Sequence, residues 1–538
     1  MGSDTSAALA RSERIALWAA AAVVLLVSFA FRVVDLGRIP GVSGDEAWYG
    51  VQVQEAIRGG HFERSTPTGN LLSPWHFGLL YIAHLVHPRP ELWMLRLPSV
   101  ISGVLLVMVA YPIMRRVAGQ LAAVYAVILL ACLPVNIAYS RLGWDSSHSV
   151  LVVMIGVGMV LMRWYLPAFA ATAGAVLIHP TNILAVPIVA GPAVAEWLAR
   201  LRSPGRMRPA KYPVWLLALC SVVGVLVFIL PYGPSVRGAF ARLLDIRGWA
   251  DFLVLYGRLL SGVTVYQYIA GPVGPAAMAV HDAVFWLVAL PLAGLGTRQW
   301  IRERRWRELG LAAALVLTLM GLYVGVGLWT IRPGTERYAL FCVAPSTVLA
   351  AMWLSSLAVS RLRRRIVTGL VVFAGCALLT GFYLDYFAAF RRTGGLSHET
   401  FWTADVEPKK AAYDLILKES GDDPVIIVAD SWWTYQPIRY LAEGTSRVSV
   451  WLTPDQSMVD EQVANGARLF LAGFSNGPFS SLSPSAYRVV GRIGLPSRDM
   501  MSVYEYKQND SSLAGPEAAA SAGARMSPSP PDTSPASE

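Results

Sequence analysis

Apolar runs of seventeen or more residues recur along this chain, and they constrain its fold more than any other feature of the sequence. A helix that crosses the hydrocarbon core of a bilayer needs about 20 such residues. The first run, Ile15 to Val34, is too long for the core of a signal peptide and is followed by no small-residue cleavage pattern, so it predicts a retained span. The composition agrees, with 15% charged residues against the roughly 25% of soluble proteins. The fold class predicted is therefore an α-helical polytopic membrane protein.

Short basic loops separate the apolar runs and predict the topology. The formal net charge of +10 would suit nucleic acid, but many of the arginines lie in these loops, which is typical of topology signals. Arg11 and Arg14 precede the first run, so residues 1–14 are expected in the cytoplasm. A count of about eleven spans places every strongly basic loop on that same side. The better-defined spans are 15–34, 97–114, 121–137, 214–230, 309–329 and 366–384, and the helical membrane module is predicted to cover 15–384.

Three segments are expected outside the bilayer. The outer loop 35–97 is predicted to hold two interfacial helices, Ala47–Arg58 and Pro74–His87. Residues 385–507 have the composition of a small soluble α/β domain, and residues 508–538 are rich in Pro, Ser and Ala, which predicts a disordered tail. In the α/β domain the predicted strands are 425–429, 448–451, 468–472, 488–493 and 502–506, and the predicted helices are 408–419 and 458–465. The domain and the outer loop are expected on the extracytoplasmic side.

Two adjacent carboxylates, Asp45 and Glu46, follow the first span directly. One interpretation is structural, because Ser43-Gly44-Asp45-Glu46 fits a capping box in which Ser43 caps a helix and Glu46 reaches back to it. Gln would serve in place of Glu46 in such a box. The functional interpretation is that one carboxylate stays free as a general base, for which an ordinary Asp is already ionised at neutral pH. Both hold if Glu46 orients the loop and Asp45 reacts.

Three further segments recur at the same expected face of the membrane. Leu95-Arg96-Leu97-Pro98-Ser99 opens the second span, Tyr139-Ser140-Arg141 with Asp145 follows the third, and Glu336-Arg337-Tyr338 opens the tenth. With the Asp-Glu pair, their order over about residues 10–385 resembles the GT-C glycosyltransferases, especially the protein O-mannosyltransferases and the bacterial aminoarabinose transferases of families 39 and 83. The resemblance implies a GT-C fold, a polyprenyl-phosphate-linked sugar as donor, and Asp45 as the catalytic base.

A phosphate leaving group needs a cation at the outer face, because it gains charge in the transition state. Arg141 and Arg337 are both expected at that level, and a guanidinium fork suits phosphate oxygens. Anchoring to lipid headgroups is the alternative for either residue. Trp48, Tyr49 and Tyr338 adjoin these groups and complete the candidate substrate-binding set. Asp145 either helps to place the acceptor or forms a plain ion pair with Arg141.

A divalent metal ion is left open as a cofactor. His76 and His179 are the histidines expected at the outer face, but Ser73-Pro74-Trp75-His76 and Ile178-His179-Pro180 depart from the pattern of the aminoarabinose transferases. A hydrogen-bonded loop histidine is the alternative interpretation of both. The aromatic run Trp432-Trp433-Thr434-Tyr435 either stacks on carbohydrate or forms a hydrophobic seam that docks the α/β domain.

The sequence therefore predicts an inverting membrane glycosyltransferase of the cell membrane. Its acceptor would be a hydroxyl of a cell-envelope glycan, a lipid-linked saccharide or a protein, its surroundings membrane lipids, and nucleic acid no partner. One rival is a transporter or lipid flippase, although such proteins place ionisable groups near the bilayer midplane. A second rival is a catalytically inactive scaffold, for which Asp45 would be dispensable.

Overall fold

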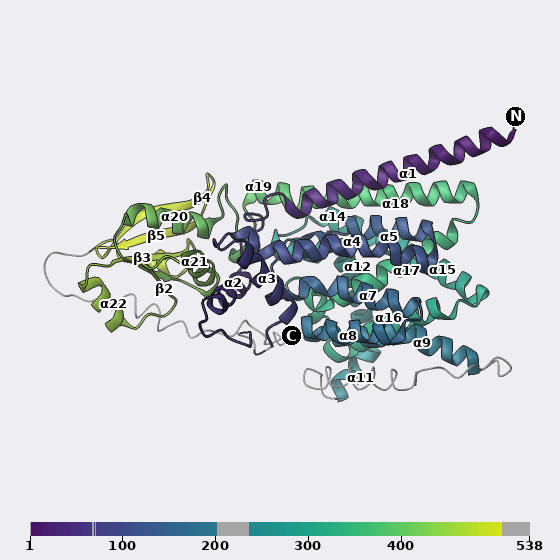
Figure 1. The fold of residues 1–538 in the computed structure, drawn as a ribbon, viewed down its shortest axis with the longest axis horizontal. Helices are drawn as coiled ribbons and strands as arrows, with labels where there is room; N and C mark the ends of the chain where they lie inside the picture. Colours follow the sequence, from purple (N-terminus) through teal and green to yellow (C-terminus); the bar gives the residue numbers. More distant parts are fainter. Residues whose placement is uncertain (1, 67–68, 70, 202–235, 508–538) are drawn as a thin grey trace.

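The computed structural model describes residues 2–66, 69, 71–201 and 236–507, and these form two parts (Figure 1). One part is a bundle of long, roughly parallel helices, and the other is a small domain built on a β-sheet. Two short helices, α2 (Gly44–Ile57) and α3 (Pro74–Val86), lie between the two parts. The predicted span 214–230 and the tail 508–538 lie outside the described residues.

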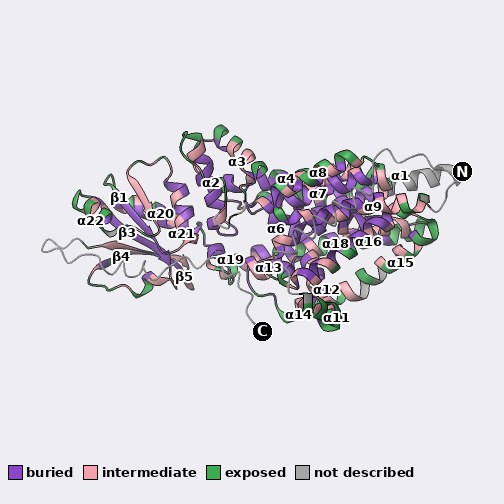
Figure 2. Ribbon diagram, turned by 90° about the horizontal axis from the view of Figure 1, so that it is seen from below, coloured by how far each residue is buried: buried purple, intermediate pink, exposed green. Residues whose placement is uncertain are grey.

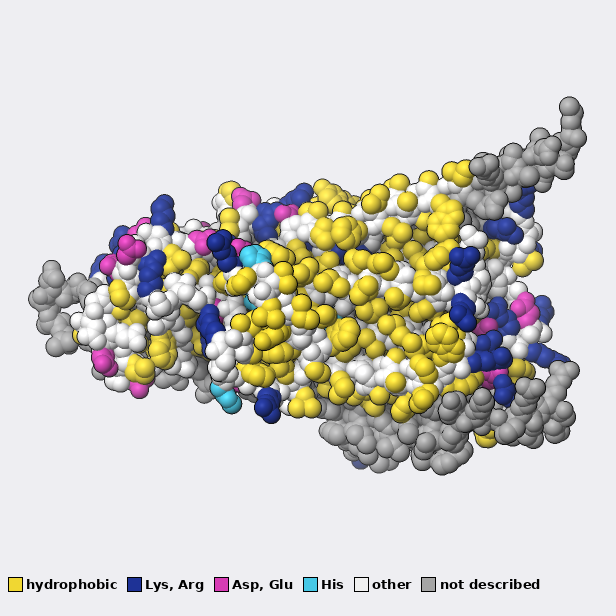
Figure 3. Space-filling model, viewed as in Figure 1, with side chains coloured by type: hydrophobic (Ala, Val, Ile, Leu, Met, Phe, Trp, Pro, Cys, Tyr) yellow, Lys and Arg dark blue, Asp and Glu magenta, His cyan; other side chains and the backbone are white. Residues whose placement is uncertain are grey.

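The bundle carries the apolar character that the sequence predicts. Within the described residues, five helical segments are long and apolar enough to cross a membrane, and shorter apolar helices accompany them. Figure 3 shows hydrophobic side chains covering the flank of the bundle, with Lys and Arg gathered at the end away from the sheet domain. The helices are α1 (Gly2–Val33), α4 (Leu97–Ala118), α5 (Gln120–Cys132), α6 (Pro134–Tyr139), α7 (Ser149–Leu161), α8 (Tyr165–Ile178), α9 (Ala185–Leu201), α14 (Pro275–Val284), α15 (Leu290–Glu303), α16 (Trp306–Val326), α17 (Val343–Leu357) and α18 (Arg361–Phe382).

One expectation for the bundle is corrected. The third predicted span is broken into α5 and α6 because Pro134 cannot donate the hydrogen bond that a continuous helix needs. The described part of the segment that follows the predicted span 214–230 is helical, with α11 (Val236–Leu244), α12 (Ile246–Ser261) and α13 (Val263–Ile269). Apolar and polar residues alternate there at helical rather than loop spacing, as in an amphipathic surface helix.

The sheet domain has the predicted strands and one additional helix. Its five strands lie in the order β2-β1-β3-β5-β4; β1 pairs in parallel with β2 and β3, and β5 pairs antiparallel with β3 and β4. The elements are α20 (Pro408–Ser420), β1 (Val425–Ala429), α21 (Trp432–Ala442), β2 (Val448–Trp451), α22 (Gln456–Ala464), β3 (Arg468–Phe474), β4 (Tyr487–Leu495) and β5 (Arg498–Tyr506). Helix α21 contains the aromatic run.

The outer loop and the sheet domain share one hydrophobic core, and Figure 2 shows buried segments both in α2 and in the strands of the sheet. Val51 of α2, Tyr440 of α21 and Phe470 of β3 belong to the same cluster and are fully buried. Ion pairs between Arg439 and Glu55 and between Arg58 and Glu443 close the rim of this contact. Helix α21 is therefore the seam by which the domain docks, and it fixes the domain next to the start of α2.

Candidate active site

The capping box at α2 has the predicted geometry. Ser43 has an extended backbone, its hydroxyl accepts the Glu46 N–H, and the Glu46 carboxylate accepts the Ser43 N–H at 2.8 Å. The same carboxylate receives both prongs of the Arg96 guanidinium, at 2.8 and 2.9 Å, and the Gly143 N–H at 2.6 Å. Glu46 and Arg96 are both fully buried. All the hydrogen-bonding capacity of Glu46 is thus used in holding the loop.

Asp45 is left free of the cap, and its side chain is 38% exposed. Its carboxylate lies 3.7 Å from a terminal nitrogen of Arg337, too far for a hydrogen bond but close enough for attraction. The indole of Trp432, from α21, donates a hydrogen bond to it. Desolvation by the surrounding protein raises the pKa of the Asp45 carboxyl, and Arg337 and Trp432 offset only part of that effect. The group is an accessible carboxylate with strengthened basicity.

Arg337 is held with its guanidinium against two aromatic rings. Its central carbon lies 5.1 Å from the ring centres of both Trp144 and Tyr338, and one nitrogen donates to the Tyr338 hydroxyl at 3.2 Å. Tyr338 stacks on Trp329 at 4.9 Å between centroids. The Arg337 Nε is buried and has no hydrogen-bond partner, so the arginine retains donor capacity at the site.

Two of the predicted segments meet directly behind these groups. The Tyr139 hydroxyl donates to the buried Glu336 carboxylate at 3.1 Å, which ties the end of α6 to the start of the segment that carries Arg337. Asp145 accepts the Ser146 N–H at 2.6 Å and the Tyr49 hydroxyl at 3.4 Å. The structure therefore brings Asp45, Asp145, Arg337, Tyr338 and the hydroxyl of Tyr49 into one neighbourhood.

Two predicted residues are placed elsewhere. The buried Arg141 guanidinium donates to backbone carbonyls of Phe31 at 2.6 Å and Ile39 at 2.5 Å and packs over the Phe387 ring, an arrangement that ties down the loop rather than presenting a phosphate contact. Asp145 and Arg141 thus have other partners, and of the two alternatives for Asp145 the ion pair with Arg141 is not formed. Trp48 is 3% exposed and lies in the hydrophobic core shared with the sheet domain, away from the open face.

The two candidate metal ligands form other contacts. His76 Nδ1 lies 2.9 Å from His148 Nε2, and His148 Nδ1 lies 2.6 Å from the Ser102 hydroxyl, so the rings share hydrogens in a buried chain. Burial lowers the pKa of His76 to about 4. His179 bonds the Thr181 hydroxyl through Nδ1 and packs 5.5 Å from the Tyr338 ring. Among the described residues no three His, Cys, Asp or Glu side chains gather in metal-binding geometry.

Sequence reasoning missed two contributors. Arg96 lies in the segment that opens the second predicted span, but only the fold shows that it pairs with Glu46. Trp432 reaches Asp45 from about 390 positions further along the chain. Gly44 permits this approach, since a Cβ there would lie 2.7 Å from the Trp432 ring. A long-range contact of this kind leaves no local signal.

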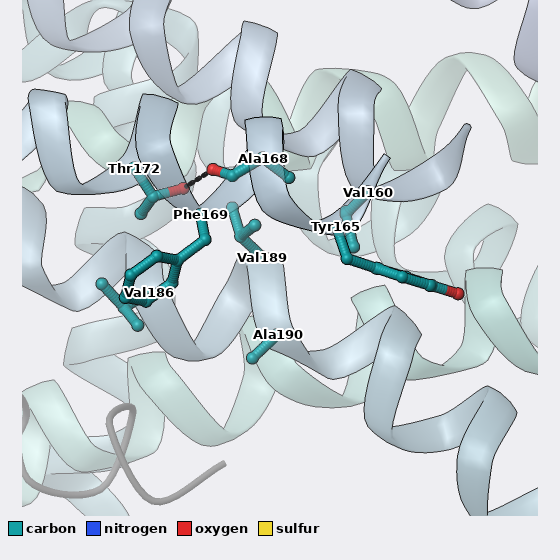
Figure 4. Close-up of a pocket in the computed structure, with 8 residues that line it drawn as sticks. All are labelled: Val160, Tyr165, Ala168, Phe169, Thr172, Val186, Val189 and Ala190. Atoms are coloured by element: carbon teal, nitrogen blue, oxygen red, sulfur yellow. Dashed lines mark hydrogen bonds between the residues drawn. The ribbon is translucent and has the colours of Figure 1, made fainter. Parts of the chain in front are cut away.

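Within the bundle, a small crevice lies among α7, α8 and α9 (Figure 4). Val160, Tyr165, Val189 and Ala190 line it, and Thr172 spends its hydroxyl on the Ala168 carbonyl at 2.8 Å. Its volume of about 10 Å³ is at the lower limit for a single water. It holds no site for a substrate.

The chain matches no protein-family model and no curated protein by sequence. Among solved structures it is similar to ArnT from Cupriavidus metallidurans in the apo state, with a TM-score of 0.51, 15% identity and coverage of 92% of this chain and 98% of that one. It is similar, too, to the structure of that ArnT bound to undecaprenyl phosphate, with a TM-score of 0.50, 15% identity and coverage of 91% of this chain and 98% of that one. The apo oligosaccharyltransferase of Archaeoglobus fulgidus has a TM-score of 0.49 and 15% identity, with coverage of 85% of this chain and 69% of that one. The chain therefore has the fold of the GT-C membrane glycosyltransferases, as its motifs predict.

Proposed function

We propose that this protein is an inverting membrane glycosyltransferase that moves a sugar from a polyprenyl-phosphate donor to an acceptor hydroxyl, with Asp45 as the base. The observation that carries the proposal is the different environment of the two adjacent carboxylates. Glu46 is buried and fully bonded, whereas Asp45 is exposed and faces Arg337. The structure of ArnT with undecaprenyl phosphate supports a donor of that chemical class.

The reaction follows from the charges in the site. The acceptor oxygen attacks the anomeric carbon, and its proton passes to the Asp45 carboxylate. The bond between the anomeric carbon and the phosphate oxygen breaks on the opposite face, and the electron pair leaves with the polyprenyl phosphate. Arg337 stabilises the charge that develops on this phosphate, because a fixed guanidinium acts most strongly on the transition state. Attack opposite the leaving group inverts the anomeric centre.

The remaining site residues have supporting roles in this scheme. Asp145 and Tyr49 lie near the base and are placed to hold the acceptor. Tyr338 keeps the guanidinium of Arg337 in position. Arg141 acts as a positioning residue, since its hydrogen bonds to the carbonyls of Phe31 and Ile39 hold the loop that precedes Asp45. The acceptor is a hydroxyl of a cell-envelope glycan, a lipid-linked saccharide or a protein.

The active site and the sheet domain are proposed to be extracytoplasmic. The support is the gathering of basic side chains at the opposite end of the bundle, as the positive-inside rule requires. A cysteine at Ser480, which is exposed in the sheet domain, should react with an impermeant reagent from outside intact cells. A cysteine at Ser360, at the start of α18, should not react. Labelling of both from the same side would contradict the arrangement.

The function itself is tested with the purified full chain, a radiolabelled polyprenyl-phosphate sugar and candidate acceptors. A new glycosidic bond made by the wild type and lost in Asp45→Asn supports the proposal. Movement of the labelled donor across a vesicle membrane without bond formation would indicate a flippase. A variant Asp45→Asn that retains every cellular function would indicate a scaffold.

A further inference from the structure

A polar pocket lies outside the catalytic neighbourhood, at the junction of the bundle and the sheet domain. It has a volume of about 300 Å³, roughly ten times the 30 Å³ that one water occupies in the liquid. Arg38 and Arg391 line it with Asp405, and Phe390 and Leu495 supply an apolar wall. A pocket of this size and mixed character fits a small charged organic group attached to something apolar.

The two arginines share one carboxylate. Arg38 pairs with Asp35 at 2.9 Å and donates to the Asp405 carbonyl at 3.2 Å, whereas Arg391 lies 3.7 Å from the same Asp35 oxygen. The Arg391 side chain is 54% exposed, so its guanidinium has donors to spare for a ligand. Two guanidinium groups around one carboxylate carry a net positive charge, and guanidinium groups are suited to bind phosphate oxygens.

The Asp405 carboxylate gives the pocket a second pole. Asp405 is exposed and lines the pocket together with Arg38 and Arg391, so the lining carries both signs of charge. A purely anionic ligand would meet this carboxylate unfavourably. A ligand with a phosphate and an ammonium group a few bonds apart satisfies both poles.

The position of the pocket indicates that its ligand belongs to the membrane. Helices α1 and α18 run side by side to this end of the bundle, where α19 (Ala389–Thr393) lies (Figure 1). Phe31 and Phe387 pack together at 5.5 Å between centroids and close the seam between them. Large apolar side chains of both helices are exposed, as on a surface that faces acyl chains: Val23, Leu26, Phe29, Val33, Leu370 and Phe373. In Figure 3 charged side chains of both signs gather where this apolar surface ends.

We infer that this pocket binds the headgroup of a zwitterionic, ethanolamine-type phospholipid. The lipid phosphate lies between Arg38 and Arg391, the ammonium faces Asp405, and the acyl chains run down the outer surface of α1 and α18. The site is separate from Asp45 and does not depend on the proposed transfer reaction. It anchors the junction of the bundle and the sheet domain to the bilayer.

The test is native mass spectrometry of the full chain in detergent, titrated in turn with phosphatidylethanolamine, phosphatidylglycerol, undecaprenyl phosphate and inorganic phosphate. The wild type should retain phosphatidylethanolamine most strongly. Arg391→Ala should weaken its binding about tenfold, as loss of a charged hydrogen bond predicts. Asp405→Asn should lower the retention of phosphatidylethanolamine only to the level at which phosphatidylglycerol is retained. Arg64→Ala, which removes an exposed arginine of the outer loop, should leave binding unchanged.

Four outcomes would overturn the inference. Equal retention of both phospholipids by the wild type would remove the role of Asp405. Displacement by inorganic phosphate would reduce the pocket to a simple anion site, and displacement by undecaprenyl phosphate would assign it to the donor. Unchanged lipid binding in Arg391→Ala, with unchanged melting, would place the lipid elsewhere.

Discussion

The Glu46 carboxylate and the Arg96 guanidinium form a fully buried, two-pronged ion pair at 2.8 and 2.9 Å. The third guanidinium nitrogen of Arg96, Nη1, donates to the carbonyls of Leu36 and Pro40, and Nη2 also donates to the carbonyl of Gly41. This one pair therefore fixes the loop before α2, the start of α4 and, through the Gly143 N–H, the segment that leads to Asp145. Asp45 therefore owes its position to a neighbour whose carboxylate is fully bonded within the protein.

Because Glu46 belongs to this buried pair and Asp45 does not, substitutions of these two neighbours should have different effects. Glu46→Gln should destabilise the fold by about 3–5 kcal/mol, because it leaves the Arg96 charge buried without its partner. The capping box by itself predicts that Gln is tolerated, and the buried pair reverses that expectation. Asp45→Asn should leave thermal unfolding unchanged and lower the transfer rate by about 10²–10⁴. Equal, small effects of both variants on rate and melting would remove Asp45 from its catalytic role.

The pH profile of transfer should report the environment of Asp45. Desolvation raises the pKa of its carboxyl, and a base must be deprotonated to act, so activity falls as the pH drops through that raised pKa. The acid limb of kcat/KM should therefore lie above the value of about 3.9 typical of an exposed Asp. Trp432→Phe removes the indole hydrogen bond that favours the carboxylate and should move the limb to higher pH. The control Trp433→Phe should leave it in place, and an identical profile for both variants would contradict the assignment.

Arg337 should act mainly on the transition state. Arg337→Ala should lower the transfer rate by about 10²–10³ with the protein still folded, as loss of a fixed donor to a developing anion does. Arg337→Lys should recover only part, since the ammonium keeps the charge but loses the planar fork that stacks on Trp144 and Tyr338. Steady-state kinetics with a polyprenyl-phosphate sugar measures both. Arg332→Ala removes an exposed arginine of the same loop and should have wild-type kinetics; equal losses in the two alanine variants would indicate a general charge effect.

Docking of the sheet domain should be sensitive at Gly44. A Cβ at this position would lie 2.7 Å from the Trp432 ring and 2.8 Å from its carbonyl oxygen, so Gly44→Ala forces α21 away from α2. We expect a loss of about 1–3 kcal/mol, the usual cost of overpacking, and a lower transfer rate. Gly78→Ala is the matched control, because a Cβ there meets nothing within 4 Å on helix α3. Thermal unfolding of the two variants decides the matter, and equal melting would mean that the domain does not need this close approach.

The sequence by itself determined those features that have a local physical signature. Long apolar runs predict spans because the bilayer sets their length, and α4, α16 and α18 lie where the runs at 97–114, 309–329 and 366–384 predict them. The spacing of Ser43 and Glu46 predicts the cap of α2, since both ends of that hydrogen-bond pair lie within one helical turn. Alternating apolar residues likewise predict the five strands of the sheet domain.

Only the tertiary structure decided how the charged groups divide between support and chemistry. Arg141 and Arg337 are equivalent in sequence, each an arginine at the outer end of an apolar run, yet one is buried against backbone carbonyls and the other faces Asp45. Arg96 and Trp432 reach the acidic pair from 50 and about 390 positions away. The physical reason is that the cost of burying a charge depends on partners that the fold brings together, and no local pattern specifies which partners those are.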